Sequence, residues 1–324
     1  MFTINELRDM IQKELDRADY VEFPEQLFEP VRYLIGDGGK RLRPVLVLMA
    51  YNLFKDDITP AMKSALGIEI FHNYTLLHDD VMDDAPIRRG MPTVHKKWNN
   101  NVAILSGDAA AIVAYKLIEH CDDIYLRRVV TYFNQMAMDI CKGQQLDMEF
   151  ETRNDVTVDE YINMIYWKTS VLLAGSLRHG ALIAGASEEI YNALYDFGGC
   201  LGLAFQLQDD FLDVYGDERT FGKKIGGDIT INKKTFMLIK ALENANAEQR
   251  AELQRWIAME QFDRAEKVRA VTELYNAIGV KEMAMAEIAN YLIKCKEILK
   301  NIPIDEERKA PFYDMITKLE GRNS

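Results

Sequence analysis

Proline is missing from a long central part of the sequence. The chain has eight prolines, but none of the 210 residues between Pro92 and Pro303 is a proline. Proline disrupts helix interiors and is tolerated in loops and first helical turns, because its ring removes a hydrogen bond and clashes with the preceding turn. Apolar residues recur at helical offsets in residues 4–15, and alternating strand patterns are rare. The sequence therefore predicts an all-α protein.

Positive charge, paired cysteines and long apolar runs are also scarce. Net charge is −12 and the pI is about 5.0, which argues against a nucleic-acid partner, since phosphate backbones require a basic surface. The four cysteines show neither CxxC nor metal-site spacing, so we expect a reducing, cytoplasmic compartment. No run of 18 apolar residues occurs, and the N-terminus is charged and amphipathic. We therefore expect no signal peptide and no transmembrane segment.

No change of composition and no repeat divides the chain. Hydrophobic residues make up 48% of the sequence, enough to bury a sizeable core. The segments 102–118 and 170–186 are almost wholly apolar and contain small residues, so we predict buried helices with close neighbours. Three short polar segments interrupt the apolar sequence, at residues 36–41, 151–159 and 216–228. We interpret them as loops within one domain of residues 1–324.

Two aspartate clusters of the same form are the most informative feature. DDVMD at 79–83 and DDFLD at 209–213 each follow an apolar run. On a helix, the first and last aspartates of each cluster share a face, where like charges four residues apart cost about 0.2–0.5 kcal/mol. One such cluster is ordinary on a solvated helix, but two in matching contexts predict a divalent metal site. Mg²⁺ is the expected ion, since it binds through one or two carboxylates, waters and substrate phosphates.

Basic residues accompany the aspartates in three places. GGKRLRP at 38–44 places cations at a predicted helix start, where anions are favoured. Arg88 and Arg89 follow the first cluster, and GKKIGGD at 222–228 follows the second. Arginine binds phosphate oxygens in a bidentate manner. We therefore expect a metal-bound phosphate site and a second, metal-free one. None of the five histidines stands in a zinc-hydrolase or serine-triad motif.

The combined motifs resemble those of the trans-isoprenyl (polyprenyl) diphosphate synthases, in particular the short-chain farnesyl and geranylgeranyl enzymes. They stand in the family's order from residue 38 to about 235: GGKRLRP, FHNYTLLHDDVMDDAPIRRGMPTVH, GQQLDMEFE, YWKTS, FQLQDDFLDVYGD and GKKIGGDI. The resemblance implies the isoprenoid synthase fold, a single large helical bundle around a central cavity, in a homodimer. It also implies a Mg²⁺-dependent transfer with three metal ions. An allylic diphosphate ionises, isopentenyl diphosphate attacks the carbocation, and a proton is lost.

The resemblance assigns roles to individual residues. The implied metal ligands are the motif aspartates Asp79, Asp80, Asp83, Asp209, Asp210 and Asp213. The implied ligands of isopentenyl diphosphate are Lys40, Arg43, His72 and Arg89. The implied ligands of the allylic diphosphate are Arg88 and Lys233, and the polar groups that flank it are Lys168, Thr169, Gln206 and Lys223. Two positions depart from the family pattern, Lys224 where proline is common and Asn232 where glycine is common.

Product length is predicted from the residues upstream of the first cluster. Tyr74 precedes Asp79 by five residues, roughly 7.5 Å along a helix at about 1.5 Å per residue. In this family an aromatic residue at that position is typical of short-chain enzymes. With Phe71 a turn deeper and the small Thr75 alongside, we expect a floor for the growing chain and a C15–C20 product, with C20 favoured.

Three alternatives remain at this point. A longer-chain synthase, of C30 or above, would share all of these motifs. A terpene cyclase would share the first cluster but would not need the basic GGKRLRP segment. A non-catalytic subunit of a heteromeric synthase tends to lose aspartates, whereas both clusters are complete in this chain. Consumption of isopentenyl diphosphate separates a synthase from a cyclase.

Overall fold

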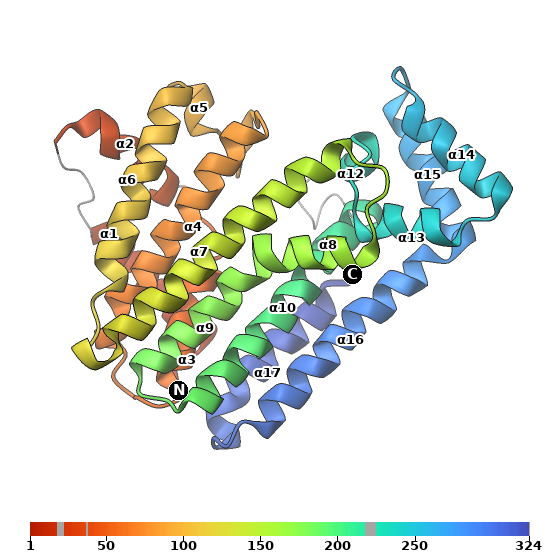
Figure 1. The fold of residues 1–324 in the computed structure, drawn as a ribbon. Coiled ribbons are helices and arrows are strands. Elements are labelled where there is room, and N and C mark those ends of the chain that lie inside the picture. Colours follow the sequence, from red (N-terminus) through yellow and green to blue (C-terminus); the bar gives the residue numbers. More distant parts are fainter. Residues whose placement is uncertain (18–22, 37, 218–224, 324) are drawn as a thin grey trace. The chain divides into compact units, whose positions relative to one another are not determined.

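The structure is a computed structural model that describes residues 1–17, 23–36, 38–217 and 225–323. The predicted all-α fold is confirmed, and the strands in the described part of the chain form one two-stranded hairpin (Figure 1). The first elements are α1 (Ile4–Arg17), α2 (Glu25–Gly36), α3 (Leu42–Asn52), η1 (Thr59–Ala61), α4 (Met62–Met82), β1 (Ile87–Arg88), β2 (Met91–Pro92), α5 (Val94–Lys97) and α6 (Asn100–Ile118). The next are α7 (Asp123–Thr152), α8 (Val158–Ile165), η2 (Tyr166–Ser170), α9 (Val171–Ile183), α10 (Glu188–Tyr215), α12 (Gly227–Thr230), α13 (Phe236–Asn244), α14 (Ala247–Ala258), α15 (Arg264–Ile278), α16 (Val280–Asn301), α17 (Glu306–Glu320) and η3 (Gly321–Asn323).

Contacts between residues divide the chain into two compact units. Unit 1 comprises Met1–Ala137, Leu172–Asp196 and Ile302–Pro311. Unit 2 comprises Met138–Val171, Phe197–Asn301 and Phe312–Ser324. The single domain expected for residues 1–324 stays a prediction.

Unit 1 is built around α4, which packs along α6 and contacts α3 (Figure 1). Every residue of α3 from Pro44 to Asn52 is buried, as its unbroken apolar sequence predicts for a helix with neighbours on all sides. Helix α9 reaches the backbone of α3 at Gly180, where a Cβ atom would lie 2.1 Å from the carbonyl oxygen of Val47. A side chain at position 180 would therefore separate the two helices.

The expected burial of residues 102–118 is only partly correct. These residues form most of α6, but Ile104, Leu105 and Ile112 are 45%, 60% and 60% exposed. Of the described helices, α6 is the one long and apolar enough to span a membrane by length and composition, and 33% of that window is buried inside the protein. The absence of a transmembrane segment therefore stays a prediction.

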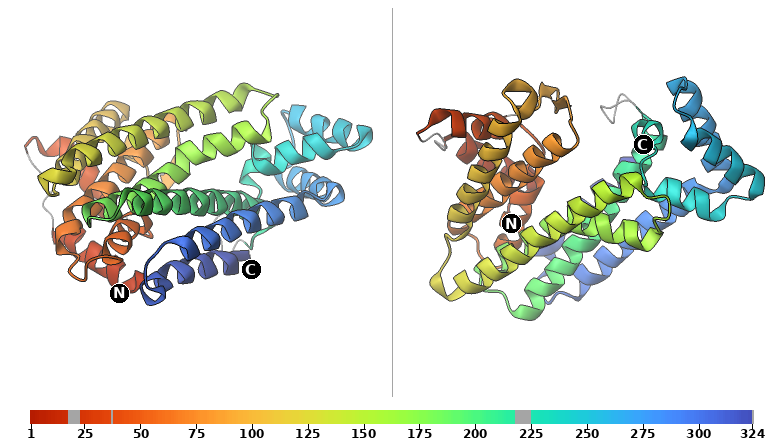
Figure 2. Two further views of the ribbon diagram at one scale, coloured as in Figure 1. Left: turned by 60° about the horizontal axis from the view of Figure 1, so that its bottom comes forward. Right: turned by 45° about the horizontal axis from the view of Figure 1, so that its top comes forward.

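Unit 2 contains the C-terminal helices. Helix α13 packs on α16, and α14 and α15 form an antiparallel pair, the α14–α15 hairpin, which contacts α12 (Figure 2). Its core includes Phe197 and Phe312, whose rings meet edge to face at 5.7 Å. The proline-free stretch is thus a succession of helices, as predicted.

Candidate active site

The first aspartate cluster lies at the carboxyl end of α4. Asp80 is 2% exposed, and its Oδ1 accepts a hydrogen bond from Arg88 Nε at 2.7 Å. Arg88 also donates to Asp79 Oδ2 at 3.3 Å. Burial raises the pKa of the Asp80 carboxyl, and the positive charge of Arg88 opposes that shift. Asp83, which ends the helix, is exposed. The cluster therefore presents one buried carboxylate and two more accessible ones.

A tight hairpin places the two arginines. Strand β1 pairs with β2 in antiparallel register, with Arg88 opposite Met91. Between the strands, Arg89 and Gly90 both have positive φ, 52° and 85°, the combination that a two-residue type I′ turn requires. The turn reverses the chain directly after Arg88. Arg88 consequently lies beside Asp79 and Asp80, and Arg89 lies within the turn itself.

The glycine-rich basic segment meets this turn. Arg89 Nη1 donates to the carbonyl oxygen of Gly38 at 2.9 Å. Gly39 has a φ of 121°, and a Cβ atom there would lie 3.0 Å from Arg89 Cζ. Only glycine combines that backbone conformation with such a close approach. Two motifs about 50 residues apart in sequence, GGKRLRP and IRRG, therefore form one basic cluster in unit 1.

Arg43 and His72 belong to the same cluster. Arg43 Nη1 lies 3.0 Å from His72 Nε2. Burial, reinforced by the charges of Arg43 and Arg89, lowers the pKa of His72 well below its ordinary value. The imidazole is therefore neutral near pH 7 and accepts the hydrogen bond from Arg43. Burial lowers the pKa of Arg43 to about 10, so this guanidinium remains charged. A neutral histidine thus orients a cation.

Arg41, one residue after Lys40, points into the core instead. Its backbone is left-handed, with φ 48°, and its side chain is 2% exposed. Arg41 Nη1 donates to Glu69 Oε1 at 2.8 Å, and Nε donates to Gln12 at 3.0 Å. Glu69 is a supporting residue that the motifs did not reveal. The available signal was a carboxylate inside the apolar run of α4.

The residues expected to form the floor line up along α4. Phe71 is buried, and its ring contacts Tyr74 at 5.3 Å and Phe133 of α7 at 4.8 Å. Tyr74 continues the row to His78 at 4.8 Å. Thr75 Oγ1 donates to the carbonyl oxygen of His72 at 2.8 Å. The aromatic row leads from the aspartate cluster into the core, and the role of Phe71, Tyr74 and Thr75 in setting product length stays a prediction.

In unit 2, Lys168 lies on a short π-helix, η2. Such turns often occur at functional sites. Lys168 Nζ donates to Asp147 Oδ2 of α7 at 2.5 Å. Helix α7 approaches η2 at Gly143, where a Cβ atom would lie 2.3 Å from the amide nitrogen of Lys168. Asp147, within the GQQLDMEFE motif, is therefore a further partner of the site to which the sequence alone assigned no role.

Polar side chains connect η2 to the second aspartate cluster. Thr169 Oγ1 donates to Gln206 Oε1 at 3.2 Å, and Gln206 Nε2 donates to Asp210 Oδ1 at 3.0 Å. The buried hydroxyl of Tyr161 donates to Asp210 Oδ2. Burial and the charge of Asp228 raise the pKa of Asp210 to about 7, while Lys233 acts in the opposite direction. Both carboxylate oxygens of Asp210 thus already accept hydrogen bonds from protein side chains.

The other two aspartates of the second cluster contact different segments. Asp209 forms an ion pair at 3.0 Å with Arg322, near the C-terminus. Asp213 Oδ2 accepts a hydrogen bond from the amide of Asp228 at 2.9 Å. Lys233 is exposed, whereas Lys223 and Lys224 lie outside the described residues.

One observation shows that the first cluster fits a divalent cation. The oxygen Oδ2 of Asp80 is buried and has no hydrogen-bond partner among the described residues. Mg²⁺ needs only one or two carboxylates and completes its shell with water and phosphate oxygens. The donor set therefore suits magnesium that arrives with a diphosphate.

Comparison with known proteins agrees with these motifs. Residues 24–275 match the family model for polyprenyl synthetases. The chain is 38% identical over 288 residues to a short chain isoprenyl diphosphate synthase of Methanothermobacter thermautotrophicus, covering 89% of this chain and 88% of that one. It is 35% identical over 303 residues to a geranylgeranyl diphosphate synthase of Methanosarcina mazei, covering 90% of each chain. A crystal structure of a geranylgeranyl pyrophosphate synthase superposes with a TM-score of 0.95 at 42% identity, over 100% of both chains. The chain therefore belongs to the polyprenyl synthetase family of prenyltransferases, as its motifs predicted.

Proposed function

We propose that this protein condenses isopentenyl diphosphate with an allylic diphosphate to give a C15–C20 all-trans polyprenyl diphosphate, with C20 favoured. The observation that carries this proposal is the pair of clusters within unit 1. Asp79 and Asp80 with Arg88 suit a metal-bound diphosphate, and Arg43 with His72 and Arg89 suits one bound without metal. An enzyme that joins two diphosphate substrates needs both kinds of site, whereas a cyclase needs only the first.

The allylic diphosphate is the leaving group in this reaction. Its C–O bond breaks heterolytically, and the diphosphate keeps the electron pair. Arg88 and Lys233 stabilise the negative charge that develops there, an electrostatic contribution commonly worth about 3 kcal/mol for one well-placed donor. Accessible aspartates of the two clusters would hold Mg²⁺, expected as three ions, and the metal would supply further positive charge to the diphosphate. Lys168 and Thr169, fixed by Asp147 and Gln206, are the polar groups we assign to its flank.

Isopentenyl diphosphate is the nucleophile. Its double bond attacks the allylic carbocation, and a proton then leaves the adduct to form the new double bond. Arg43, Arg89 and Lys40 bind its diphosphate, and neutral His72 holds Arg43 in orientation without adding charge. The inorganic diphosphate released from the allylic substrate is the proton acceptor we favour. The mutual repulsion of the gathered arginines is relieved when the anion binds.

Product length follows from the aromatic row. A growing chain that leaves the aspartates along α4 meets Tyr74 and then the buried contact of Phe71 with Phe133. Bulky rings held by edge contacts resist displacement, because interiors are closely packed. The names of the relatives, short chain and geranylgeranyl synthases, support the same range.

The exposed face of α6 supports a homodimer. Ile104, Leu105, Ile112 and Tyr115 are all 38% or more exposed on this one helix. Ile124, at the start of α7 in the same unit, is 72% exposed. A row of large apolar side chains on one face typically marks a contact surface. The partner we propose is a second copy of the chain. All four cysteines are free thiols, in keeping with the proposed cytoplasmic location.

The test is a product assay. Purified protein is incubated with Mg²⁺, isopentenyl diphosphate and dimethylallyl diphosphate, and products are read by mass spectrometry. We expect C15–C20 products with loss of activity on chelation of the metal. Asp79→Asn should lower kcat by at least about 100-fold, as expected for lost charge stabilisation. A C30 or longer product would favour the longer-chain alternative. Absence of condensation with any allylic starter would refute the proposal.

A further inference from the structure

Residues 225–235 follow the second aspartate cluster and are attached to it. The carboxylate of Asp213 accepts from the amide of Asp228, and the carbonyl oxygen of Asp213 accepts from Gly226 at 2.6 Å. The amide of Lys233 in turn donates to the carbonyl oxygen of Asp228 at 3.0 Å. The segment therefore determines where Lys233 stands relative to the cluster.

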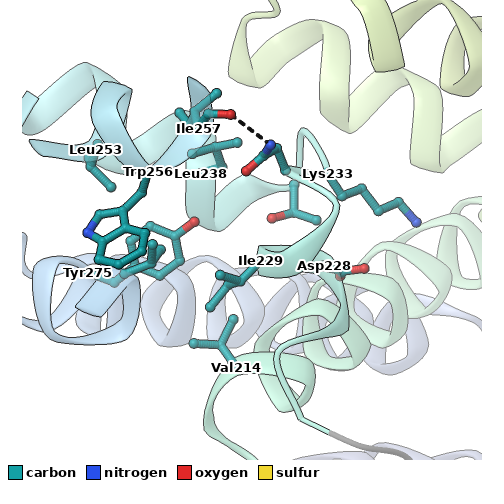
Figure 3. A pocket seen from close by; sticks show the side chains of 12 residues that line it. Val214, Asp228, Ile229, Lys233, Leu238, Leu253, Trp256, Ile257 and Tyr275 are labelled. Carbon is teal, nitrogen blue, oxygen red and sulfur yellow. Dashed lines mark hydrogen bonds between the residues drawn. The ribbon is translucent and has the colours of Figure 1, made fainter. Parts of the chain in front are cut away.

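Asn232, where the family commonly has glycine, has a left-handed backbone. Its φ is 54°, a conformation that asparagine adopts more readily than most residues. Unlike glycine, it has a side chain that connects the segment to both helices of the α14–α15 hairpin. Its Nδ2 donates to the carbonyl oxygen of Ile257 at 3.1 Å (Figure 3), and its Oδ1 accepts from Lys267 Nζ at 2.8 Å.

Lys267 is a buried cation. It is 1% exposed, and its ammonium group lies 4.2 Å from the centre of the Phe262 ring. An ammonium group taken out of water needs strong acceptors, because an unpaired buried charge is costly. The Asn232 oxygen accepts its hydrogen bond, and the aromatic face adds a cation–π contact. Loss of Asn232 would therefore disturb Lys267 as well as the segment.

Two further contacts hold the beginning of the segment on the same hairpin. Arg264 Nη2 donates to the carbonyl oxygen of Ile225 at 2.7 Å. A Cβ atom at Gly226 would lie 2.5 Å from Val268 Cγ2, so the backbone there rests directly on α15. Trp256 and Tyr275 line one end of a pocket that Asp228 and Lys233 also line, and the Lys233 side chain extends away from the two aromatic residues (Figure 3). The hairpin thus supports one side of the segment and leaves Lys233 exposed on the other.

We propose that Asn232 and Lys267 are positioning residues, which fix the 225–235 segment on the α14–α15 hairpin and so place Lys233 to bind the diphosphate of the allylic substrate. The proposal rests on the function proposed above for the identity of the ligand. Neither residue contacts the substrate, and both act through the backbone that carries Lys233. In this chain a side-chain bridge at position 232 replaces the usual glycine.

Three variants separate the parts of the bridge. Asn232→Gly keeps the left-handed backbone and removes both hydrogen bonds. Asn232→Asp keeps an acceptor for Lys267 and removes only the donor to Ile257. Lys267→Met keeps the aliphatic packing and removes the ammonium group. Asn244→Gly is a matched control, because Asn244 ends α13 on the surface and its side chain donates to the carbonyl oxygen of Lys240 within the same helix.

Two measurements are made on the full-length protein. Hydrogen exchange followed by mass spectrometry measures the exchange rate of the hydrogen-bonded amides in residues 225–235. Calorimetry with Mg²⁺ measures the affinity for inorganic diphosphate, and steady-state kinetics give KM for each substrate. We expect about 10-fold faster exchange and about 10-fold weaker diphosphate binding in Asn232→Gly and Lys267→Met, the size of one or two lost hydrogen bonds. KM for the allylic substrate should rise with KM for isopentenyl diphosphate unchanged. Asn244→Gly should resemble the wild type. Asn232→Asp keeps the Lys267 contact but loses the one to Ile257, so it should fall between the wild type and Asn232→Gly.

Each of these results either supports or refutes the positioning role proposed for Asn232 and Lys267. Unchanged exchange in Asn232→Gly would refute the bridge. Faster exchange with unchanged diphosphate binding would refute its positioning role, and so would an equal rise in both KM values. Should the wild type bind Mg²⁺ and diphosphate yet form no product, the proposed function fails, while the exchange and calorimetric comparisons still decide the inference.

Discussion

His179 provides a quantitative prediction about acid stability. It lies on α9 in unit 1 and is 6% exposed, and burial lowers its pKa from 6.5 to about 4. Above pH 6.5 the imidazole is neutral in both the folded and the unfolded chain, so it contributes no pH dependence. As pH falls below 6.5, the unfolded chain binds a proton that the folded chain does not. Stability is therefore lost with falling pH until about pH 4, where both forms are charged.

The magnitude follows from the size of the shift. A change of one pKa unit corresponds to about 1.4 kcal/mol, so the step from 6.5 to about 4 amounts to about 3 kcal/mol by pH 4 and about 2 kcal/mol by pH 5. Nε2 of His179 has no hydrogen-bond partner among the described residues. Leucine is apolar and of similar size, so His179→Leu should cost little at pH 7.

Urea unfolding of the wild type and of His179→Leu, at pH values between 7 and 4, measures the effect. The difference in unfolding free energy between the two should shift by about 2 kcal/mol in favour of the leucine variant from pH 7 to pH 5. Other titrating groups, such as His72, are present in both proteins and cancel in the difference. A difference that stays constant with pH would refute the assignment of His179 as a buried neutral group.

Four further predictions test the site and the surface. Tyr74→Ala should lengthen the product seen by mass spectrometry if the aromatic row limits it, and an unchanged product would contradict that role. Gly39→Ala should raise KM for isopentenyl diphosphate about 10-fold, because its φ of 121° and the 3.0 Å approach of Arg89 exclude a side chain. A Cβ atom at Gly36 would meet nothing within 4 Å, so Gly36→Ala should resemble the wild type in the same assay. Glu69→Gln should lower the unfolding free energy by about 3 kcal/mol in urea titration, since it leaves the buried Arg41 without its counter-charge; a loss below about 1 kcal/mol would show that the pair is unimportant for stability. Leu105→Glu should convert a dimer to a monomer in analytical ultracentrifugation, and a mutant that keeps its mass would exclude this face of α6.

The sequence by itself determined the helices and the chemistry. The absence of proline over 210 residues predicted a succession of helices, because proline is excluded from helix interiors. Two clusters of the same form predicted a metal and diphosphate site, since charge repulsion between like neighbours requires a compensating ligand. These inferences depend only on how residues are spaced along the chain, and the amino-acid sequence contains that information completely.

Only the tertiary structure decided what each side chain faces. Arg41 and Arg43 stand two residues apart in one motif, yet the first is buried on Glu69 and the second meets His72 in the basic cluster. Asp210 has both oxygens engaged by neighbours, one of them Tyr161, 49 residues away. The outer face of α6 is exposed although its sequence is largely apolar. Periodicity predicts which residues share a face, but the partner of that face comes from distant segments, and burial and pairing depend on that partner.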